Sequence, residues 1–137
     1  IKKLSQENNN IFFHPAVEPE VVLEYTSSAD IGIIYVEKPC LSYIYSMPNK
    51  LFEYATAGLM IMASDNLLEI KDYILSNEIG VLIESDNMNK LNDTLNFIKY
   101  SDLEKFKNNA LKSMIDNDWS KQEIKLIDEY KRAFNAK

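Results

Sequence analysis

The sequence predicts an α/β fold in which a doubly wound parallel sheet is covered by helices on both faces. Three runs of mainly apolar residues, at 31–37, 59–64 and 79–85, have the length and composition of buried strands. Helical segments separate these runs, and helical patterns alone follow residue 86. Because parallel strands need a crossover connection, usually a helix, this alternation predicts a parallel sheet.

The first thirty residues predict a helix end, a strand and a second helix. Residues 1–10 are typical of the end of a helix followed by a polar turn. The apolar stretch 11–17 predicts a short strand that ends near Pro15. Residues 19–30 predict a helix, since Pro19 suits a first helical turn and the apolar residues that follow share a face.

The middle of the chain carries the clearest signals for where loops and helices begin and end. A loop with two prolines, 38–49, follows the first of the three apolar runs, and a helix is expected over 50–58. Gly58 suits a left-handed cap at the end of that helix. After the next strand, Asn66 and Glu69 have the spacing of a capping box, which predicts another helix start.

The C-terminal part predicts three successive helices. Ser101 with Glu104, and Ser120 with Glu123, repeat the capping-box spacing. Trp119 is expected to anchor the last helices to the sheet. The length of 137 residues suits a single domain, with an α/β core over 1–100 and closing helices over 101–137.

Composition excludes several classes of function. The net charge of −6 argues against a nucleic-acid surface, which would need clustered Lys and Arg. One cysteine, Cys40, excludes an internal disulfide, and one histidine, His14, leaves no His/Cys metal cluster. No apolar stretch is long enough to span a bilayer, and no signal-peptide pattern opens the chain. We therefore expect a cytoplasmic protein without a metal or cofactor.

Glu53 is the residue that most needs a functional explanation. It is the only charged side chain between Leu51 and Ala63, and an unpaired buried carboxylate is costly. The loop before its helix should leave the carboxyl end of a strand, where doubly wound folds bind ligands. Loop amides, the helix dipole and Lys50 would favour a phosphate there, and Glu53 would suit a ribose diol.

These residues resemble a known family. The ordered set "ADIGIIYVE", "PNKLFEYATAG", "MIMASD" and "IGVLIESDN" is similar to the C-terminal half of retaining glycosyltransferases of the GT-B fold, in the large family 4 group. The resemblance covers about residues 11–98 and is carried mainly by the "PNKLFEY…AG" motif in its strand–loop–helix–strand order. It implies a Rossmann-like domain that binds the nucleotide-sugar donor.

The resemblance also implies which residues form the site. The family frames the donor with a pair of glutamates, and the matching positions here are Tyr45 and Glu53, with seven residues between them. The match implies that Glu53 holds the ribose, whereas the first position is not acidic in this chain. The implied diphosphate and sugar contacts come from the loop and the helix start, and the nucleobase contacts from the turn after the first expected strand. In full, the donor-binding residues are Tyr45, Ser46, Met47, Pro48, Asn49, Lys50 and Glu53, and the base-binding residues are Pro15, Ala16 and Val17.

The family pattern contains parts that have no counterpart in this sequence. The first strand of the donor domain, central in the order 3-2-1-4-5-6, and the N-terminal acceptor domain are both missing. We therefore expect half of a GT-B fold that does not turn over substrate alone, because the reaction occurs between two domains. The expected substrate is a UDP- or GDP-sugar, and the acceptor a polysaccharide or glycolipid. Such an acceptor suits a parent protein at the inner face of the membrane, associated with it peripherally.

Other interpretations stay open at the level of sequence. Glu53 could lie exposed on a packing helix, and Lys50 could be an ordinary surface lysine. A degenerate, non-catalytic glycosyltransferase-like module for protein assembly is the main rival, with Tyr45 marking the loss of activity. A receiver-type signalling domain ranks last, because no acidic cluster follows the first strand.

Overall fold

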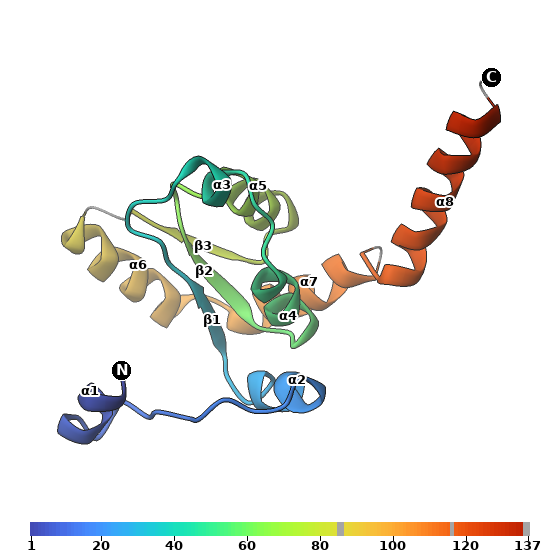
Figure 1. Ribbon diagram of the computed structural model, residues 1–137. Coiled ribbons are helices and arrows are strands. Elements are labelled where there is room, and N and C mark those ends of the chain that lie inside the picture. The colour runs from blue at the N-terminus through green and yellow to red at the C-terminus, as the bar shows by residue number, and fades with distance from the viewer. Residues whose placement is uncertain (85–86, 116, 136–137) are drawn as a thin grey trace.

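The computed structural model describes residues 1–84, 87–115 and 117–135 (Figure 1). Its centre is a parallel sheet of strands β1 (Ile31–Ile34), β2 (Met60–Ser64) and β3 (Gly80–Ile83), in the order β1-β2-β3. In the register, Ile33 lies beside Met62, and Met62 beside Val81. The predicted α/β class with a parallel sheet is confirmed, and each strand is shorter than the apolar run that predicted it.

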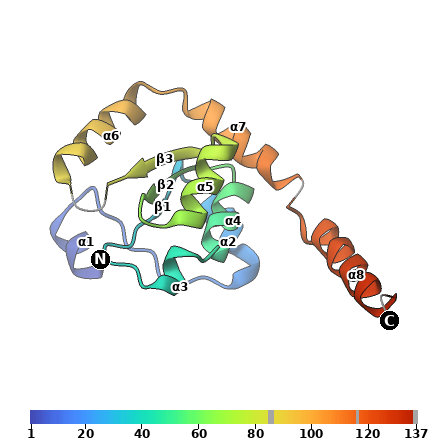
Figure 2. The same cartoon turned by 90° about the horizontal axis from the view of Figure 1, so that it is seen from above.

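Helices cover both faces of this sheet (Figures 1 and 2). The crossover helices α4 (Asn49–Thr56) and α5 (Leu68–Asn77) lie on one face, together with α7 (Leu103–Met114). Helix α6 (Met88–Tyr100) lies on the opposite face, against β3. Because both faces are buried around β2, all five of its residues are buried.

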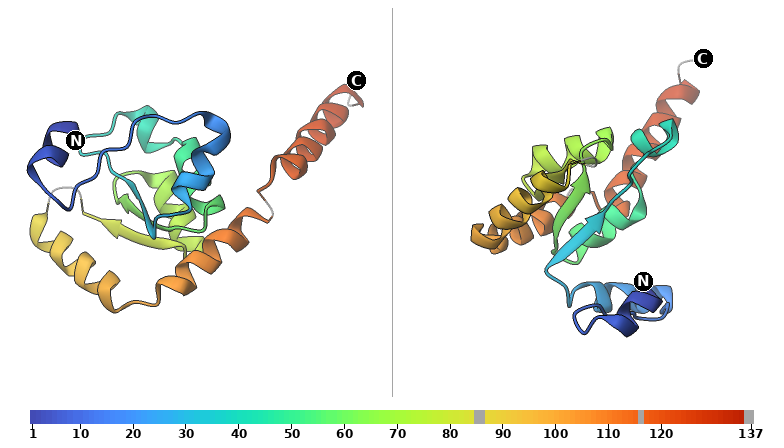
Figure 3. Two further views of the ribbon diagram at one scale, coloured as in Figure 1. Left: turned by 90° about the horizontal axis from the view of Figure 1, so that it is seen from below. Right: turned by 90° about the vertical axis from the view of Figure 1, so that its left-hand side faces the viewer.

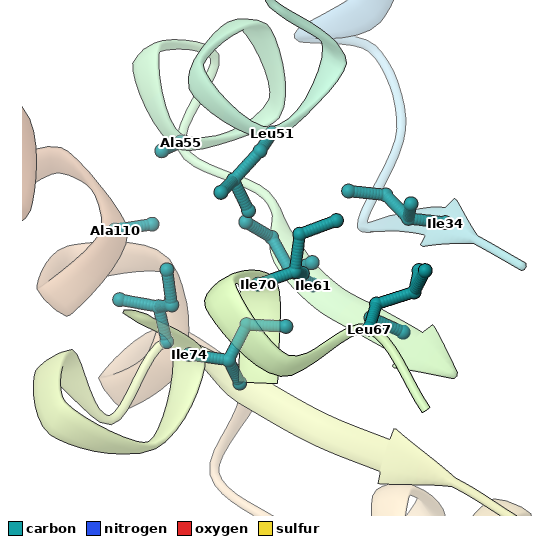
Figure 4. Packing of buried hydrophobic residues seen from close by; sticks show 10 residues of the cluster. Ile34, Leu51, Ala55, Ile61, Leu67, Ile70, Ile74 and Ala110 are labelled. Carbon is teal, nitrogen blue, oxygen red and sulfur yellow. The ribbon is translucent and has the colours of Figure 1, made fainter. Parts of the chain in front are cut away.

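The main core lies between the sheet and the helices α4, α5 and α7 (Figure 4). Leu51 and Ala55 come from α4, one turn apart, so a single stripe of that helix faces the sheet. Ile70 and Ile74 repeat this spacing on α5. The buried residues of this core are Ile34, Leu51, Ala55, Ile61, Ala63, Leu67, Ile70, Ile74, Ile79 and Ala110. A smaller core of Met60, Met62, Ile83 and Ile98 lies on the α6 face.

The N-terminal part lies beside the sheet without joining it. Helix α1 (Lys2–Glu7) leads through an extended segment to the 3-10 helix η1 (Pro19–Val21) and to α2 (Val22–Thr26), which packs on α4. The strand predicted at 11–17 is wrong, since these residues pair with no strand in the described part of the chain. A strand needs a neighbouring strand for its backbone hydrogen bonds, and sequence pattern alone cannot supply one.

The helix predicted at 19–30 ends early. Thr26, Ser27 and Ser28 each donate a side-chain hydrogen bond to a backbone carbonyl three or four residues earlier. Such bonds compete with the continuing helix, so α2 stops at Thr26.

Two predicted caps in the C-terminal part are wrong. The N-cap of α7 is Asp102, whose carboxylate accepts a hydrogen bond from the Lys105 amide at 3.2 Å, and the expected Ser101 lies one residue before it. At the start of α8 (Trp119–Asn135), Asp118 accepts the bond from the Ser120 amide, so Ser120 is not the cap. In both cases an aspartate within two residues of the expected serine provides the acceptor.

Helix α8 projects away from the rest of the molecule (Figures 1 and 3). None of its described residues is buried, and Trp119 is 68% exposed. The prediction that Trp119 anchors the last helices to the sheet is therefore wrong. In the part of the chain that the structure describes, no helix has both the length and the apolar character needed to cross a bilayer.

Candidate functional site

The candidate site lies where the chain leaves β1 and enters α4. The connection contains a short helix, α3 (Leu41–Ile44), and ends at Pro48, the N-cap of α4, whose φ of −73° and ψ of 150° are extended. Proline has a fixed φ and no N–H, so it suits the residue that brings the chain into the first turn. The amino end of α4 lies near the carboxyl end of β1, because Pro48 and Lys50 line a hollow together with Ile34 and Val36.

The side chains of Ser64, at the end of β2, and of Asn66, just beyond it, hold the start of this connection through hydrogen bonds to its backbone. The buried Ser64 Oγ accepts a hydrogen bond from the Val36 amide at 2.8 Å. Asn66 donates its side-chain amide to the carbonyl oxygens of Val36 at 3.1 Å and Glu37 at 3.3 Å. The expected N-cap role of Asn66 is wrong, because its side chain bonds to this loop and Leu67 is the N-cap of α5.

Glu53 lines a hollow of about 360 Å³ between α4 and the η1–α2 segment. Its side chain is half-buried, and no described residue donates a hydrogen bond to its carboxylate or forms an ion pair with it. Asn49 lies one turn earlier on the same face of α4 and Thr56 almost one turn later. The apolar wall of this hollow is formed by Pro19, Val22, Leu23 and Phe52.

A second, smaller hollow of about 160 Å³ lies at the carboxyl end of β1. Ser46, Pro48 and Lys50 line it together with Tyr35 and Tyr43. Lys50 is exposed, so its ammonium group can reach a ligand without first leaving a buried contact. The rest of the lining comes from Ile34, Val36, Leu67 and Ile70, which also belong to or pack against the main core.

The residues predicted for donor binding are therefore divided between the two hollows. Asn49 and Glu53 line the larger one. Ser46, Pro48 and Lys50 line the smaller one. The side chains of Tyr45 and Met47 are exposed and line neither hollow.

The predicted base-binding residues lie outside both hollows. Pro15 and Ala16 are exposed, Val17 is half-buried, and none of the three lines either hollow. Pro19, two residues beyond Val17, does line the Glu53 hollow. The segment 15–17 therefore precedes the residue that lines the hollow, which is Pro19, the first residue of η1.

Sequence reasoning missed the apolar wall of the larger hollow. The sequence pattern places Val22 and Leu23 on the packing face of a helix and gives Phe52 no functional signal by itself. Phe52 follows Asn49 by three residues, and Thr56 follows Glu53 by three. Asn49 and Glu53, like Phe52 and Thr56, are four residues apart, so one helix face carries all four side chains. That spacing was the available signal, whereas the approach of α2 to α4 is tertiary.

Tyr54, the neighbour of Glu53 in α4, faces the sheet. It packs against the main core, and its ring fills the space beside Gly32, where a β-carbon would overlap it. Burial raises the pKa of the Tyr54 phenol above its ordinary value of 10.0, and the negative charge of Glu53 raises it further. Tyr54 therefore stays neutral at physiological pH.

Within the described residues, no group of three His, Cys, Asp or Glu side chains is placed to hold a metal ion. Cys40 is exposed, in the connection that follows β1. The site therefore offers a carboxylate, an ammonium group, a helix N-terminus and apolar walls.

Comparison with protein-family models, with curated protein sequences and with solved structures found no match.

Proposed function

We propose that this chain is the nucleotide-sugar donor-binding half of a retaining glycosyltransferase with a GT-B fold. The full enzyme would transfer a sugar from a nucleotide diphosphate sugar to a polysaccharide or glycolipid acceptor. The observation that carries the proposal is the Glu53 side chain, which lines a hollow of about 360 Å³ and has no hydrogen-bond or ion-pair partner among the described residues. Glu53 lies three residues after Lys50 and four after Asn49, the first residue of α4. The resemblance of the "PNKLFEY…AG" segment supports the same assignment.

The two hollows suit two parts of such a ligand. A ribose diol would donate two hydrogen bonds to the Glu53 carboxylate, and charge-assisted bonds of this kind are strong. Pro19, Leu23 and Phe52 would cover the apolar parts of the nucleoside. The diphosphate would lie at the amino end of α4, where the helix dipole and Lys50 attract negative charge.

In this mechanism the domain positions the donor and stabilises the leaving group. Negative charge grows on the diphosphate as the bond to the sugar breaks, and Lys50 with the α4 amides would stabilise it. Glu53 would hold the ribose and so place the anomeric carbon for attack. The leaving phosphate would accept the proton of the acceptor hydroxyl, and an acceptor domain would supply that hydroxyl. The donor-binding half alone is thus expected to bind nucleotide without turnover.

Nucleotide binding by the chain tests this function. UDP and GDP would be titrated by calorimetry into the wild type and into the Glu53→Gln variant. Hydrogen bonds to a charged group contribute about 1.5–3 kcal/mol, so the variant should bind about 10- to 100-fold more weakly. Glu123→Gln, on the exposed helix α8, is the matched control and should bind like the wild type. The proposal fails if a folded wild type binds neither nucleotide at millimolar concentration, or if Glu53→Gln binds equally well.

A second candidate is a non-catalytic, glycosyltransferase-like interaction module. The observation that favours it is Tyr45, which replaces the first acidic residue of the family pattern and is 60% exposed outside both hollows. An exposed tyrosine of this kind suits a protein contact, because interface hot spots are enriched in tyrosine. A folded chain that ignores both nucleotides would favour this candidate.

A further inference from the structure

The connection from β1 to α4, residues 35–48, has little packing to hold it in place. None of these residues is buried. Two of its side chains, Tyr43 and Ser46, line the hollow that also contains Lys50. Segments with few buried contacts open at a low free energy. The shape of this hollow therefore depends on the hydrogen bonds that fix the connection where it leaves β1.

The register of the sheet shows which backbone groups would bond if β1 continued past its last residue. Ile34 pairs with Ala63, so Val36 would lie opposite residue 65. The Met60 amide donates to the Asp30 carbonyl, which means that Asp30 directs its backbone toward β2. In a parallel ladder every second residue has this direction, and Val36 is one of them.

The side chains of Ser64 and Asn66 take the place of their own backbone groups as partners of Val36. A continued ladder would join the Val36 amide to the Ser64 carbonyl, and the Val36 carbonyl to the Asn66 amide. In the structure the Val36 amide donates to the Ser64 Oγ at 2.8 Å, and the Asn66 Nδ2 donates to the Val36 carbonyl at 3.1 Å. The same Nδ2 donates to the Glu37 carbonyl at 3.3 Å. These three bonds are called the Val36 clamp below.

The Val36 clamp lies beside the hollow of about 160 Å³ that contains Lys50. Val36 lines this hollow, and so does Leu67, the residue that follows Asn66. Strands joined by a backbone ladder lie about 4.8 Å apart, whereas a side chain between them holds them further apart. A continued ladder at Val36 would therefore draw the end of β1 toward β2 and narrow the hollow. Ser64 is fully buried, so its hydroxyl group has a fixed position in this gap.

We propose that Ser64 and Asn66 are positioning residues for the diphosphate of the donor. They hold Val36 away from β2 and so keep open the hollow in which Lys50 and the amino end of α4 meet a diphosphate. This inference rests on the proposed function for the identity of the anion. Neither residue has to touch the ligand, because each acts through the backbone of Val36.

Calorimetric titration with inorganic pyrophosphate, UDP and uridine tests this role. Ser64→Ala and Asn66→Ala each remove hydrogen bonds of the Val36 clamp. Each variant should bind pyrophosphate and UDP about three- to tenfold more weakly than the wild type, the range that corresponds to the net contribution of one hydrogen bond. Uridine carries no phosphate, so its affinity should not change. A merely structural role would weaken all three ligands together or none of them.

Asn77→Ala is the matched control for these variants. The Asn77 side-chain amide also donates to a backbone carbonyl, that of Tyr73 at 2.8 Å, but at the far end of α5. This variant should bind all three ligands like the wild type. Combining Ser64→Ala with Asn66→Ala should cost less than the product of the two single effects, because both side chains hold Val36. Hydrogen exchange at the Val36 amide should be faster in Ser64→Ala than in the wild type.

Glu53→Gln separates this inference from the proposed function. Glu53 lines the other hollow, so this variant should lose affinity for UDP without losing affinity for pyrophosphate. A wild type that ignores UDP but binds pyrophosphate, with the expected dependence on Ser64 and Asn66, would overturn the nucleotide assignment and leave the Val36 clamp in place. The clamp is overturned if both of its variants bind pyrophosphate and UDP like the wild type, or if they lose uridine binding equally. It is also overturned if a folded wild type binds neither pyrophosphate nor UDP at millimolar concentration.

Discussion

At the scale of single residues, Gly80 sets how closely β3 approaches β2. A β-carbon at Gly80 would lie 2.7 Å from the carbonyl carbon of Ile61, which is backbone of the neighbouring strand. A β-carbon at Gly32 would instead overlap the Tyr54 ring, which is a side chain. We expect Gly80→Ala to lower the free energy of unfolding by about 1–3 kcal/mol or more, because the strands must separate. Urea denaturation should show a smaller loss for Gly32→Ala, and equal losses would contradict this reasoning.

Tyr54 gives the stability of the protein a pH dependence in alkaline solution. Because its pKa is raised in the folded state by burial and by Glu53, the unfolded chain loses this proton first as the pH rises. The contribution of the protonated Tyr54 phenol to the free energy of unfolding is fully present below pH 10, the pKa of an unperturbed tyrosine. It is lost as the pH rises through the folded-state pKa. Above about pH 10 the wild type should therefore lose unfolding free energy relative to Tyr54→Phe, which has no phenol to titrate. Urea denaturation across this range measures it, and a pH-independent difference would contradict it.

At the scale of elements, α7 depends on its cap and on the contacts of one face. Asp102 accepts the Lys105 amide, and Ala110 of the same helix is buried in the main core. Asp102→Ala should lower the free energy of unfolding by about 1 kcal/mol, the usual cost of losing an N-cap. Ser101→Ala should have little effect in the same urea titration, although sequence spacing favoured Ser101 as the cap. The reverse order of effects would show that the cap is assigned to the wrong residue.

At the scale of the whole molecule, α8 contributes little to the folded core. None of its described residues is buried, whereas α7 packs against α4 and β2. A chain that ends after Asp118 should still fold, as seen by circular dichroism. Its free energy of unfolding should fall by less than about 1 kcal/mol. A chain that ends after Tyr100 should not fold, because it lacks Ala110 and the helix that covers α4. A large loss on removal of α8 alone would show that the helix packs on the body.

The sequence predicted the elements that carry their own local signal. The β-branched run at β1, the spacing of Leu51 and Ala55 on α4, and the left-handed Gly58 with φ of 70° each depend on residues only a few positions apart in the sequence. The position of Glu53 on a helix after a proline-ended loop followed from the same local pattern. Its capacity to bind a nucleotide stays a prediction that the calorimetric test decides.

What the sequence could determine by itself was the order of β1, β2 and β3 with the helices between them, the α/β class, and the identity of the one carboxylate in an apolar helix. These features depend on residue type and short spacing. Tertiary structure decided the rest. It left residues 11–17 without a strand partner, brought Pro19 and Leu23 to Glu53, and turned Asn66 toward the loop after β1. Each of these outcomes depends on which distant backbone or side chain lies within hydrogen-bonding or packing distance, and no local pattern contains that distance.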